Sequence, residues 1–392
     1  MTGPLDILIV GGGIAGCSAA IALANRGHRI RLVEKQAVWK FQSSGIFVYA
    51  NGLVSLEELG LLDGILAAGF AIPGGRNAYY DHTGKPIVET VYPTAAEGRI
   101  PAILGIKRAE LHRVMAGRVA DLGIPMRLGT TVTALSEVSD KTTATFSDGT
   151  TSTHDLVIAA DGVNSSMRQM IGVTKKPRYT GFGVWRSVHP RPVDLRVKVM
   201  MMGPGKRFGI MPISDDKLYT FGTLAEPKGK HFPHEDWPDL MRAKFAEFKG
   251  PATPYLEELS HGSEILFTAV QEVVLPLPWH RGRVVLIGDA AHASTPFMGQ
   301  GGAMAMQDAL VLADAIDRNP GLEEALTAFG QARLPVCQFV QDVSRAVGDA
   351  GAREHAGQLD ARDAELRLTA QTNVDQFYER LADLTDSSDL HQ

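Results

Sequence analysis

The sequence predicts an α/β protein in which one parallel-sheet domain is assembled from separated parts of the chain. Near the N-terminus, the apolar run 7–10 leads into a glycine-rich turn and a helical pattern, and the run 284–288 does the same much later. Such runs are typical of buried parallel strands. Between about residues 181 and 271, short alternating segments joined by polar turns indicate an inserted antiparallel sheet. Helices are expected from about residue 322 onward.

Composition and charge exclude several classes of protein. The 392-residue chain has a formal net charge of −5, with 44% hydrophobic and 21% charged residues, which is typical of a globular protein of two or three domains. The charge favours neither nucleic acid nor an anionic membrane as a partner, and no apolar run approaches the roughly 18 residues of a membrane span. Cys17 and Cys337 form neither a disulfide framework nor a CxxC pair, so we expect a reducing, cytoplasmic setting. No His, Cys, Asp and Glu residues have metal-ligand spacing, so we expect no metal.

The first glycine-rich turn has the pattern of a dinucleotide site. Gly11, Gly13 and Gly16 form GxGxxG between the run 7–10 and a helical pattern, and the next strand ends at Glu34. The glycines allow a pyrophosphate to approach the helix N-terminus, where free N–H groups and the helix dipole favour an anion. Glu34 is placed to accept hydrogen bonds from ribose hydroxyls. The motif by itself leaves NAD and FAD open, and no second GxGxxG in this context follows it.

Two further motifs lie at the ends of apolar strands. The stretch AADGVNSSMR (159–168) carries Asp161 and Gly162 directly after such a strand. The stretch GDAAHASTPFMGQGG (288–302) places Asp289 at the end of another. Open α/β sheets bind ligands at the carboxyl ends of their parallel strands, so we expect these side chains to lie at one ligand edge.

These motifs, in this order and with Arg108 at the start of a helical pattern, resemble the single-component FAD-dependent aromatic hydroxylases, the para-hydroxybenzoate hydroxylase family of flavin monooxygenases. The resemblance extends from residue 5 to about residue 340. It implies a Rossmann-like domain with tightly bound FAD, and NADH or NADPH as a transient electron donor. The residues that we assign to FAD binding on this basis are Gly11, Gly13, Ile14, Ala15, Gly16, Glu34, Lys35, Ser44, Gly45, Arg108, Val132, Asp161, Gly162, Asp289, Pro296, Gly299, Gly301 and Gly302.

The loop 288–302 is interpreted as the platform for the flavin. Asp289 offers a carboxylate to the hydroxyls of the ribityl chain, and Pro296 stiffens the loop. The glycines at its end allow backbone N–H groups to approach a flat ring without obstruction by a Cβ atom. A helix from about residue 302 then points its N-terminus at that ring, where its dipole would stabilise the negative charge of reduced flavin. The match around Ser43, Ser44 and Gly45 resembles the flavin-side loop of the family.

The domains are expected to interleave along the chain. We assign residues 1–75, 98–180 and 272–340 to the FAD-binding domain, residues 76–97 and 181–271 to the substrate domain, and residues 341–392 to a C-terminal helical segment. Within them we expect a helix over 108–123, short strands over 126–135, 142–146 and 154–160, and a helical stretch over 233–259.

The inserted sheet is the natural roof of a substrate pocket. Arg207, Gly209 and Met211 share one face of an expected strand by the two-residue period, and Tyr219 lies on the next strand. Arg207 would bind an anionic ring substituent and Tyr219 would hydrogen-bond another, so the catalytic candidates are Arg207, Tyr219 and Pro296. The alternative for Arg207 is a surface charge, and for Tyr219 a half-buried sheet aromatic. GKRFGIMPIS with Tyr219 is similar to the FAD-dependent urate hydroxylase branch, which favours a nitrogen heteroaromatic substrate.

The family resemblance implies a hydroxylation in which NAD(P)H reduces FAD, oxygen forms a C4a-hydroperoxide, and its distal oxygen attacks an electron-rich ring carbon. The partners are then a small aromatic or heteroaromatic substrate and molecular oxygen, and the chain is a monomer or homodimer. The alternatives are a flavin-binding redox sensor without hydroxylase activity and another flavin oxidoreductase such as a halogenase. His292 could titrate near neutrality, but its position favours packing within the loop over catalysis.

Overall fold

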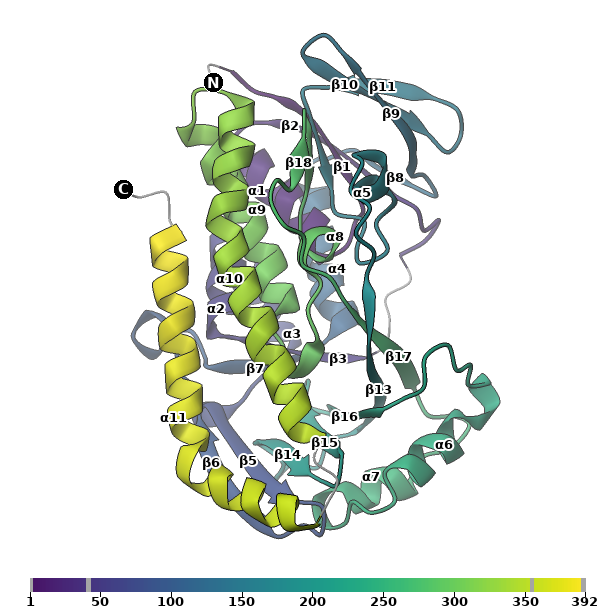
Figure 1. The fold of residues 1–392 in the computed structure, drawn as a ribbon, viewed down its shortest axis with the longest axis vertical. Coiled ribbons are helices and arrows are strands. Elements are labelled where there is room, and N and C mark those ends of the chain that lie inside the picture. Colours follow the sequence, from purple (N-terminus) through teal and green to yellow (C-terminus); the bar gives the residue numbers. More distant parts are fainter. Residues whose placement is uncertain (1–2, 40–43, 353–355, 389–392) are drawn as a thin grey trace.

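The computed structural model describes residues 3–39, 44–352 and 356–388. One layer, in the upper half of Figure 1, is a six-stranded sheet whose strands run parallel except at one edge. Its strands, in spatial order, are β18 (His280–Arg281), β19 (Val284–Leu286), β12 (Leu156–Ala159), β1 (Asp6–Val10), β2 (Arg29–Glu34) and β8 (Met126–Leu128). The middle strands are runs of Ile, Leu and Val with almost no exposed surface, as expected for a sheet that is covered on both faces. The predicted α/β fold with a Rossmann-like core is confirmed.

Helices cover this sheet and carry the loops that follow its strands. Helix α1 (Ile14–Asn25) packs closely on α9 (Gly301–Arg318), because small buried residues such as Ala19 and Ala20 allow the two helix axes to approach each other. The remaining helices of this part of the chain are α2 (Ala50–Glu58), α3 (Leu62–Ala68), α4 (Arg108–Asp121), α5 (Ser166–Met170) and α8 (Asp289–His292). Among the described residues, no helix is both long and apolar enough to cross a membrane.

A seven-stranded sheet forms the second layer of the molecule. In spatial order it contains β17 (Ile265–Glu272), β13 (Arg178–Pro190), β16 (Lys217–Ala225), β15 (Lys206–Pro212), β14 (Lys198–Met202), β5 (Arg76–Asp81) and β6 (Pro86–Val91). The inserted strands β13 to β17 pair antiparallel with one another, as predicted, and β14 also pairs in parallel with β5. The physical reason is that β5 comes from a distant part of the chain, so no hairpin sets its direction.

The two faces of this sheet pack against different partners. Trp185 and Phe208 lie on one face, in a cluster with the aromatic side chains of α6 (Trp237–Lys244) and α7 (Thr253–Glu257). Met211 and Tyr219 lie on the other face, against the small sheet of β3 (Gly45–Tyr49), β7 (Ile103–Lys107) and β4 (Phe70–Ala71). The expected helical stretch 233–259 is broken into two short helices and 3-10 turns, because Pro251 and Pro254 cannot donate the backbone hydrogen bonds of a continuous helix.

A fourth sheet, of three strands, lies at the far end of the molecule and contains β9 (Val132–Val138), β10 (Lys141–Phe146) and β11 (Thr151–His154). The expected single strand 154–160 is two strands that belong to different sheets. Asp155 separates them, since its N–H donates to the carbonyl of Asp6 and its carboxylate accepts from the N–H of the same residue at 2.8 Å. The 3-10 turns of the structure are Pro73–Gly75, Ala96–Gly98, His234–Asp236, Gly250–Ala252 and Pro296–Met298.

Two long helices complete the fold, α10 (Leu322–Gly351) and α11 (Ala356–Ser388), and Figure 1 shows α11 lying beside β5 and β6. The amide of Gln371 pairs with both backbone groups of Val91, donating to its carbonyl at 2.9 Å and accepting from its N–H at 2.8 Å. Buried Arg362 donates to the carbonyls of Met202 and Gly203 at 3.1 and 2.8 Å. These contacts attach α11 to the seven-stranded sheet, where it covers a cavity that the sequence analysis did not predict.

Candidate active site

The glycine-rich loop after β1 has the geometry of a phosphate cradle. Gly11 has φ +106°, and a Cβ atom at Gly16 would overlap the carbonyl oxygen of Gly11, so only glycine fits at Gly16. Helix α1 begins at Ile14 without a side-chain cap and without an acidic residue in its first turn. A Cβ atom at Gly13 would meet nothing within 4 Å. The positive end of α1 is therefore open to an anionic group.

Glu34 lies at the end of β2 and closes this loop from the side. Its two carboxylate oxygens accept the N–H groups of Gly12 at 2.8 Å and of Gln36 at 2.9 Å. A carboxylate oxygen has two acceptor sites, so these bonds leave room for ribose hydroxyls. Lys35 follows with an exposed side chain.

Replacing Glu34 with alanine is expected to weaken FAD binding by about 1–3 kcal/mol, because the ribose hydroxyls and the N–H of Gly12 lose their acceptor. The measurement is a titration of flavin-depleted protein with FAD. Glu34→Gln keeps one acceptor oxygen and should recover part of the affinity. Equal affinity in the wild type and the alanine variant would remove Glu34 from the site.

The residues after β12 supply a second acceptor. Asp161 uses one carboxylate oxygen to accept the N–H of Met167 at 3.1 Å, and its other oxygen, Oδ1, is buried without a hydrogen-bond partner among the described residues. Gly162 follows directly, next to the carboxyl ends of β1 and β12. A buried, unpaired carboxylate oxygen at the ligand edge of a parallel sheet fits a hydroxyl donor from a cofactor.

The loop between β19 and α9 surrounds the same edge. The side chain of Asp289 is exposed on the loop. The surrounding protein still removes part of the water around its carboxylate, and this desolvation raises its pKa. Gly299 has φ +67° and lies directly against the ring of Phe47, so a side chain would fit neither the backbone nor the space. A Cβ atom at Gly301 or Gly302 would make only ordinary van der Waals contacts, at 3.8 to 3.9 Å. Helix α9 starts here with neither a side-chain cap nor an acidic residue, so its positive end is also free for an anionic ring.

A buried charge cluster holds this loop in place. Asp308 of α9 accepts the N–H of Gly288 at 2.7 Å, contacts the imidazole of His292 at 2.5 Å, and accepts from Arg333 of α10 at 2.8 Å. His292 is buried and paired with Asp308, and this pairing raises its pKa against the effect of burial. His292, Asp308 and Cys337 come close enough to suggest metal ligands, but the guanidinium of Arg333 already neutralises Asp308.

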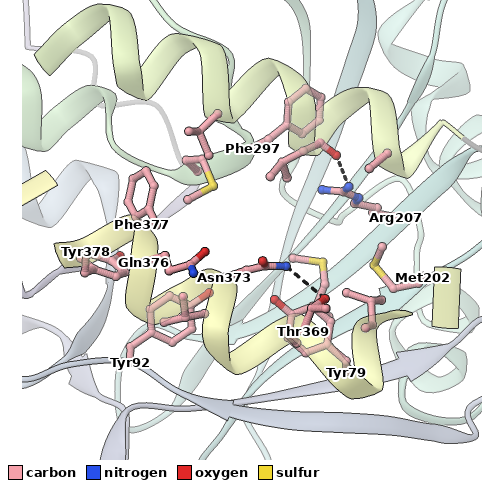
Figure 2. Close-up of a pocket in the computed structure, with 18 of the residues that line it drawn as sticks. Tyr79, Tyr92, Met202, Arg207, Phe297, Thr369, Asn373, Gln376, Phe377 and Tyr378 are labelled. Carbon is pink, nitrogen blue, oxygen red and sulfur yellow. Dashed lines mark hydrogen bonds between the residues drawn. The ribbon is translucent and has the colours of Figure 1, made fainter. Parts of the chain in front are cut away.

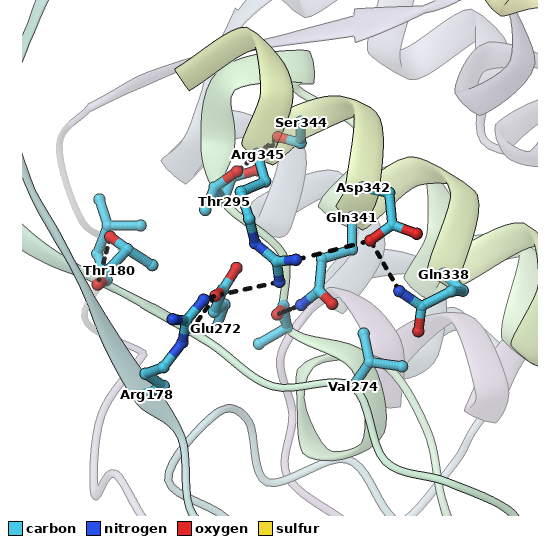
Figure 3. Close-up of polar contacts among 12 residues, drawn as sticks. Arg178, Thr180, Glu272, Val274, Thr295, Gln338, Gln341, Asp342, Ser344 and Arg345 are labelled. Carbon is cyan, nitrogen blue, oxygen red and sulfur yellow. Dashed lines mark hydrogen bonds and ion pairs between the residues drawn. The ribbon is translucent and has the colours of Figure 1, made fainter. Parts of the chain in front are cut away.

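Helix α10 packs against the platform loop, as Figure 3 shows. Ser344 donates to the carbonyl of Thr295 at 2.8 Å, one residue before the 3-10 turn that contains Pro296. The next residue, Arg345, forms an ion pair with buried Glu272 at 3.2 Å, and Arg178 of β13 bonds the same carboxylate at 3.1 Å. Because these pairs tie α10 to the seven-stranded sheet, the platform loop is fixed between the two layers.

The remaining assigned residues differ in what they can offer. The N–H of Arg108 donates to the carbonyl of Ser44 at 2.8 Å, which places the exposed Arg108 side chain and Gly45 at one end of β3 and β7. Val132 is buried in the core, so only its backbone could contact FAD. Ser43, in the flavin-side motif, lies outside the described residues.

A cavity of about 460 Å³ lies between the seven-stranded sheet and helices α10 and α11 (Figure 2). Phe297 and Met298 of the platform loop are among the residues that line it. Arg207 stands in its wall, donates to the carbonyl of Val347 at the end of α10, and lies over the ring of Phe297 at 5.9 Å. Burial lowers the pKa of Arg207 to about 10. The cavity thus joins the sheet roof to the platform loop.

Tyr219 is not brought into this cavity with Arg207, contrary to the expectation that both line one pocket. It projects from the same face of the sheet, but its ring lies against Gly45 and stacks on Phe221 with 5.4 Å between the ring centres. Burial raises its pKa. Tyr219 therefore sits beside the flavin-side loop, and the strand period alone could not show which neighbour it would meet.

Several cavity residues were missed by the sequence prediction. A group of tyrosines and one lysine come from strands, from the residue after β6 and from α11, far apart in the chain and without a shared motif. Only the alternation of β14 offered a signal, since Met200 and Met202 line the cavity while Met201 faces the core. The missed residues are Tyr49, Tyr79, Tyr92, Lys198 and Tyr378.

The glycine cradle, the unpaired Asp161 oxygen and the two uncapped helix ends fit FAD, and a family model described as FAD binding domain matches residues 4–344. The chain belongs to this family. The flavoprotein is 32% identical to aurachin C monooxygenase/isomerase of Stigmatella aurantiaca, covering 95% of this chain and 96% of that one. It is 30% identical to the 2-heptyl-3-hydroxy-4(1H)-quinolone synthase of Pseudomonas aeruginosa, covering 96% and 97%.

The solved structures agree with this assignment. The crystal structure of Klebsiella pneumoniae HpxO complexed with FAD and uric acid has a TM-score of 0.87 and 27% identity, covering 97% of this chain and 98% of that one. The resemblance to FAD-dependent aromatic hydroxylases is confirmed, and the flavoprotein is an FAD-dependent monooxygenase.

Proposed function

We propose that the protein uses NADH or NADPH and molecular oxygen to hydroxylate an electron-rich aromatic or nitrogen-heteroaromatic compound that carries an apolar substituent. The observation behind this proposal is the cavity that begins at the platform loop, at Phe297 and Met298, and continues under α11. Its volume of about 460 Å³ falls within the roughly 300–1,000 Å³ of small-molecule sites.

The lining of the cavity supports both parts of the substrate. The apolar part of the wall would hold an alkyl or aryl substituent, and it consists of Phe339, Val343, Val347, Leu366, Ala370, Val374 and Phe377. The polar part, with Arg207, would hold the ring substituents. The names of two relatives, an aurachin monooxygenase and a heptyl-hydroxyquinolone synthase, are compatible with such a compound.

Bound FAD supplies the redox chemistry, taking electrons from NAD(P)H and delivering one oxygen atom of O2 to the substrate. The residues of this chain do the rest. The glycine cradle, Glu34 and Asp161 hold the cofactor, the loop of Pro296 positions its ring, and Arg207 orients the substrate anion. Helix α11 covers the cavity and excludes water from the reacting atoms.

The test is a screen of the purified holoprotein for NAD(P)H consumption and hydroxylated product. The panel pairs phenols, hydroxypyridines, quinolones and purines with and without an alkyl substituent. We expect a quinolone or phenol with an alkyl group to accelerate flavin reduction and to yield product. Consumption of NAD(P)H by none of them would favour a redox sensor, and a product that requires halide would favour a halogenase.

Arg207→Ala is expected to leave the FAD content unchanged, to raise the substrate constant about tenfold, and to shift turnover toward hydrogen peroxide. The reason is that the cavity loses a planar, charged donor for the substrate anion. Arg207→Lys should recover only part of the coupling, since the charge returns without the donor fork. Coupling is measured as product formed per NAD(P)H consumed. Exposed Arg196 of the same domain provides the matched control, and Arg196→Ala should behave as wild type. Unchanged coupling in Arg207→Ala would contradict this role.

A further inference from the structure

Lys198 is a buried lysine in the wall of the cavity. It is the first residue of β14, has 3% of its surface exposed, and projects toward the cavity on the same face as Met200 and Met202. Its ammonium nitrogen donates to the hydroxyl of Tyr49 at 2.9 Å. Lysine is rarely buried to this degree without a paired acid, so its position calls for a function.

The surroundings of Lys198 are aromatic. Its nitrogen lies 4.7 Å from the ring centre of Phe47, 5.4 Å from that of Tyr49 and 5.3 Å from that of Tyr92. Among the described residues, no carboxylate forms an ion pair with it, and Tyr49 is its hydrogen-bond partner. The faces of aromatic rings replace only part of the stabilisation that water gives to an ammonium group. In the part of the chain that the structure describes, Lys198 therefore lacks a negatively charged partner.

The ionisable residues that line the cavity include more cations than acids. Cations come from β14, β15 and α11, whereas α11 supplies the one acid among the described lining residues. Arg362 is already paired with Asp363 at 2.8 Å. Besides Lys198, the ionisable lining residues are Tyr49, Tyr79, Tyr92, Arg207, Arg362, Glu365, Tyr378 and Arg380.

Lys198 also lies close to the platform loop. The ring of Phe47 separates the two, since one side of it is near the Lys198 nitrogen and its edge lies directly against Gly299. A substrate ring that enters the cavity beside this loop would meet Lys198 within the same aromatic enclosure.

We propose that Lys198 is a catalytic residue that binds the acidic oxygen of the substrate, a hydroxyl or enol on the aromatic ring, and takes its proton. The step is a proton transfer: the lone pair of Nζ accepts the proton of the O–H group, which leaves an ammonium beside a ring-bound oxygen anion. That anion is the negative partner that Lys198 lacks, and its charge makes the ring carbons more electron-rich for oxygen transfer. The inference rests on the proposed function and narrows its substrates to aromatics with an ionisable ring oxygen.

The acid–base behaviour of the residue suits this role. Burial lowers the pKa of Lys198 to about 7, so a large fraction of it is a free amine near neutral pH. Catalysis by the amine should therefore increase as the pH rises through about 7 and should be lost below it.

The experiment uses the FAD-containing protein and 4-nitrophenol, whose anion has its own absorption band. Wild type, Lys198→Met, Lys198→Arg and Lys85→Met are titrated by difference spectroscopy at a pH below the pKa of the free phenol. Lys85 is exposed in the turn between β5 and β6 and serves as the control. We expect wild type and Lys85→Met to bind the compound as its anion. Lys198→Met should bind it about tenfold more weakly and in the neutral form, and Lys198→Arg should again bind the anion.

FAD content, measured for each variant, reports on folding and on the cofactor site independently of Lys198. Binding of the same anion with the same affinity by Lys198→Met would overturn the proposal, as would a wild type that binds only the neutral phenol or none. Anion binding that depends on Lys198, in a protein that hydroxylates nothing in the panel, would support the site while contradicting the proposed function. The two failures are thus distinguishable.

Discussion

Gly16→Ala is expected to give a protein that purifies without FAD. A Cβ atom at this position would overlap the carbonyl oxygen of Gly11, which belongs to the backbone and cannot rotate away as a side chain could. Gly11 is itself constrained, with φ +106° and close contact with Ala160. The loop would have to open, and the N–H groups at the start of α1 would lose their alignment toward the pyrophosphate. We expect affinity for FAD to fall about 100-fold or more, equivalent to about 2.8 kcal/mol.

The measurement is the flavin-to-protein absorbance ratio after purification, followed by titration of flavin-depleted protein with FAD. The control is Gly117→Ala, in the interior of α4, where a Cβ atom meets nothing within 4 Å. That variant should remain yellow and gain roughly 0.5–1 kcal/mol of stability, because alanine favours a helix over glycine. A Gly16→Ala protein with full FAD content would show that the loop does not hold the cofactor.

Asp308→Asn is expected to lower the free energy of unfolding by about 3–5 kcal/mol, since it leaves Arg333 buried without its counter-charge. Asp308 and Arg333 have no exposed surface, so water cannot compensate. The loop should loosen as well, because the N–H of Gly288 loses a charged acceptor just before Asp289. FAD binding should weaken together with stability. Chemical denaturation of the holoprotein and FAD titration measure the two effects.

The pH dependence of this stabilisation follows from the charges. His292 and Arg333 lower the pKa of Asp308 to about 2, below the roughly 3.9 of an unfolded aspartate. Its contribution is therefore complete above about pH 4 and is lost as the pH falls through about 2. The raised pKa of His292 acts in the opposite direction, and its contribution is complete below the unfolded value of about 6.5 and lost at higher pH.

A matched control lies on the same helix. Asp317 of α9 is exposed and pairs with Arg26, so Asp317→Asn should cost at most about 1 kcal/mol at any pH. If Asp308→Asn were no more destabilising than Asp317→Asn, the buried cluster would not be what holds the platform loop.

The sequence by itself determined the candidate cofactor site, because each of its parts is local. GxGxxG needs only a strand, a turn and a helix in succession, and Glu34 ends the very next strand of the same unit. The same holds for Asp161 and Asp289, which directly follow buried strands and therefore reach the ligand edge of the sheet together. Local secondary structure fixes the spatial arrangement of residues that are close in the chain, so these positions could be predicted without coordinates.

Only the tertiary structure decided the cavity that we assign to the substrate, because its walls come from segments with no fixed relation along the chain. Lys198 faces Tyr49 across 149 positions, and α11 closes the space through contacts such as Arg362 with Met202. Sequence analysis placed Arg207 and Tyr219 on neighbouring strands of one sheet, but the packing of other elements directs Arg207 into the cavity and Tyr219 against Gly45. Burial without a counter-charge is a property of packing, and that is why the lysine that we assign to the substrate was invisible in the sequence.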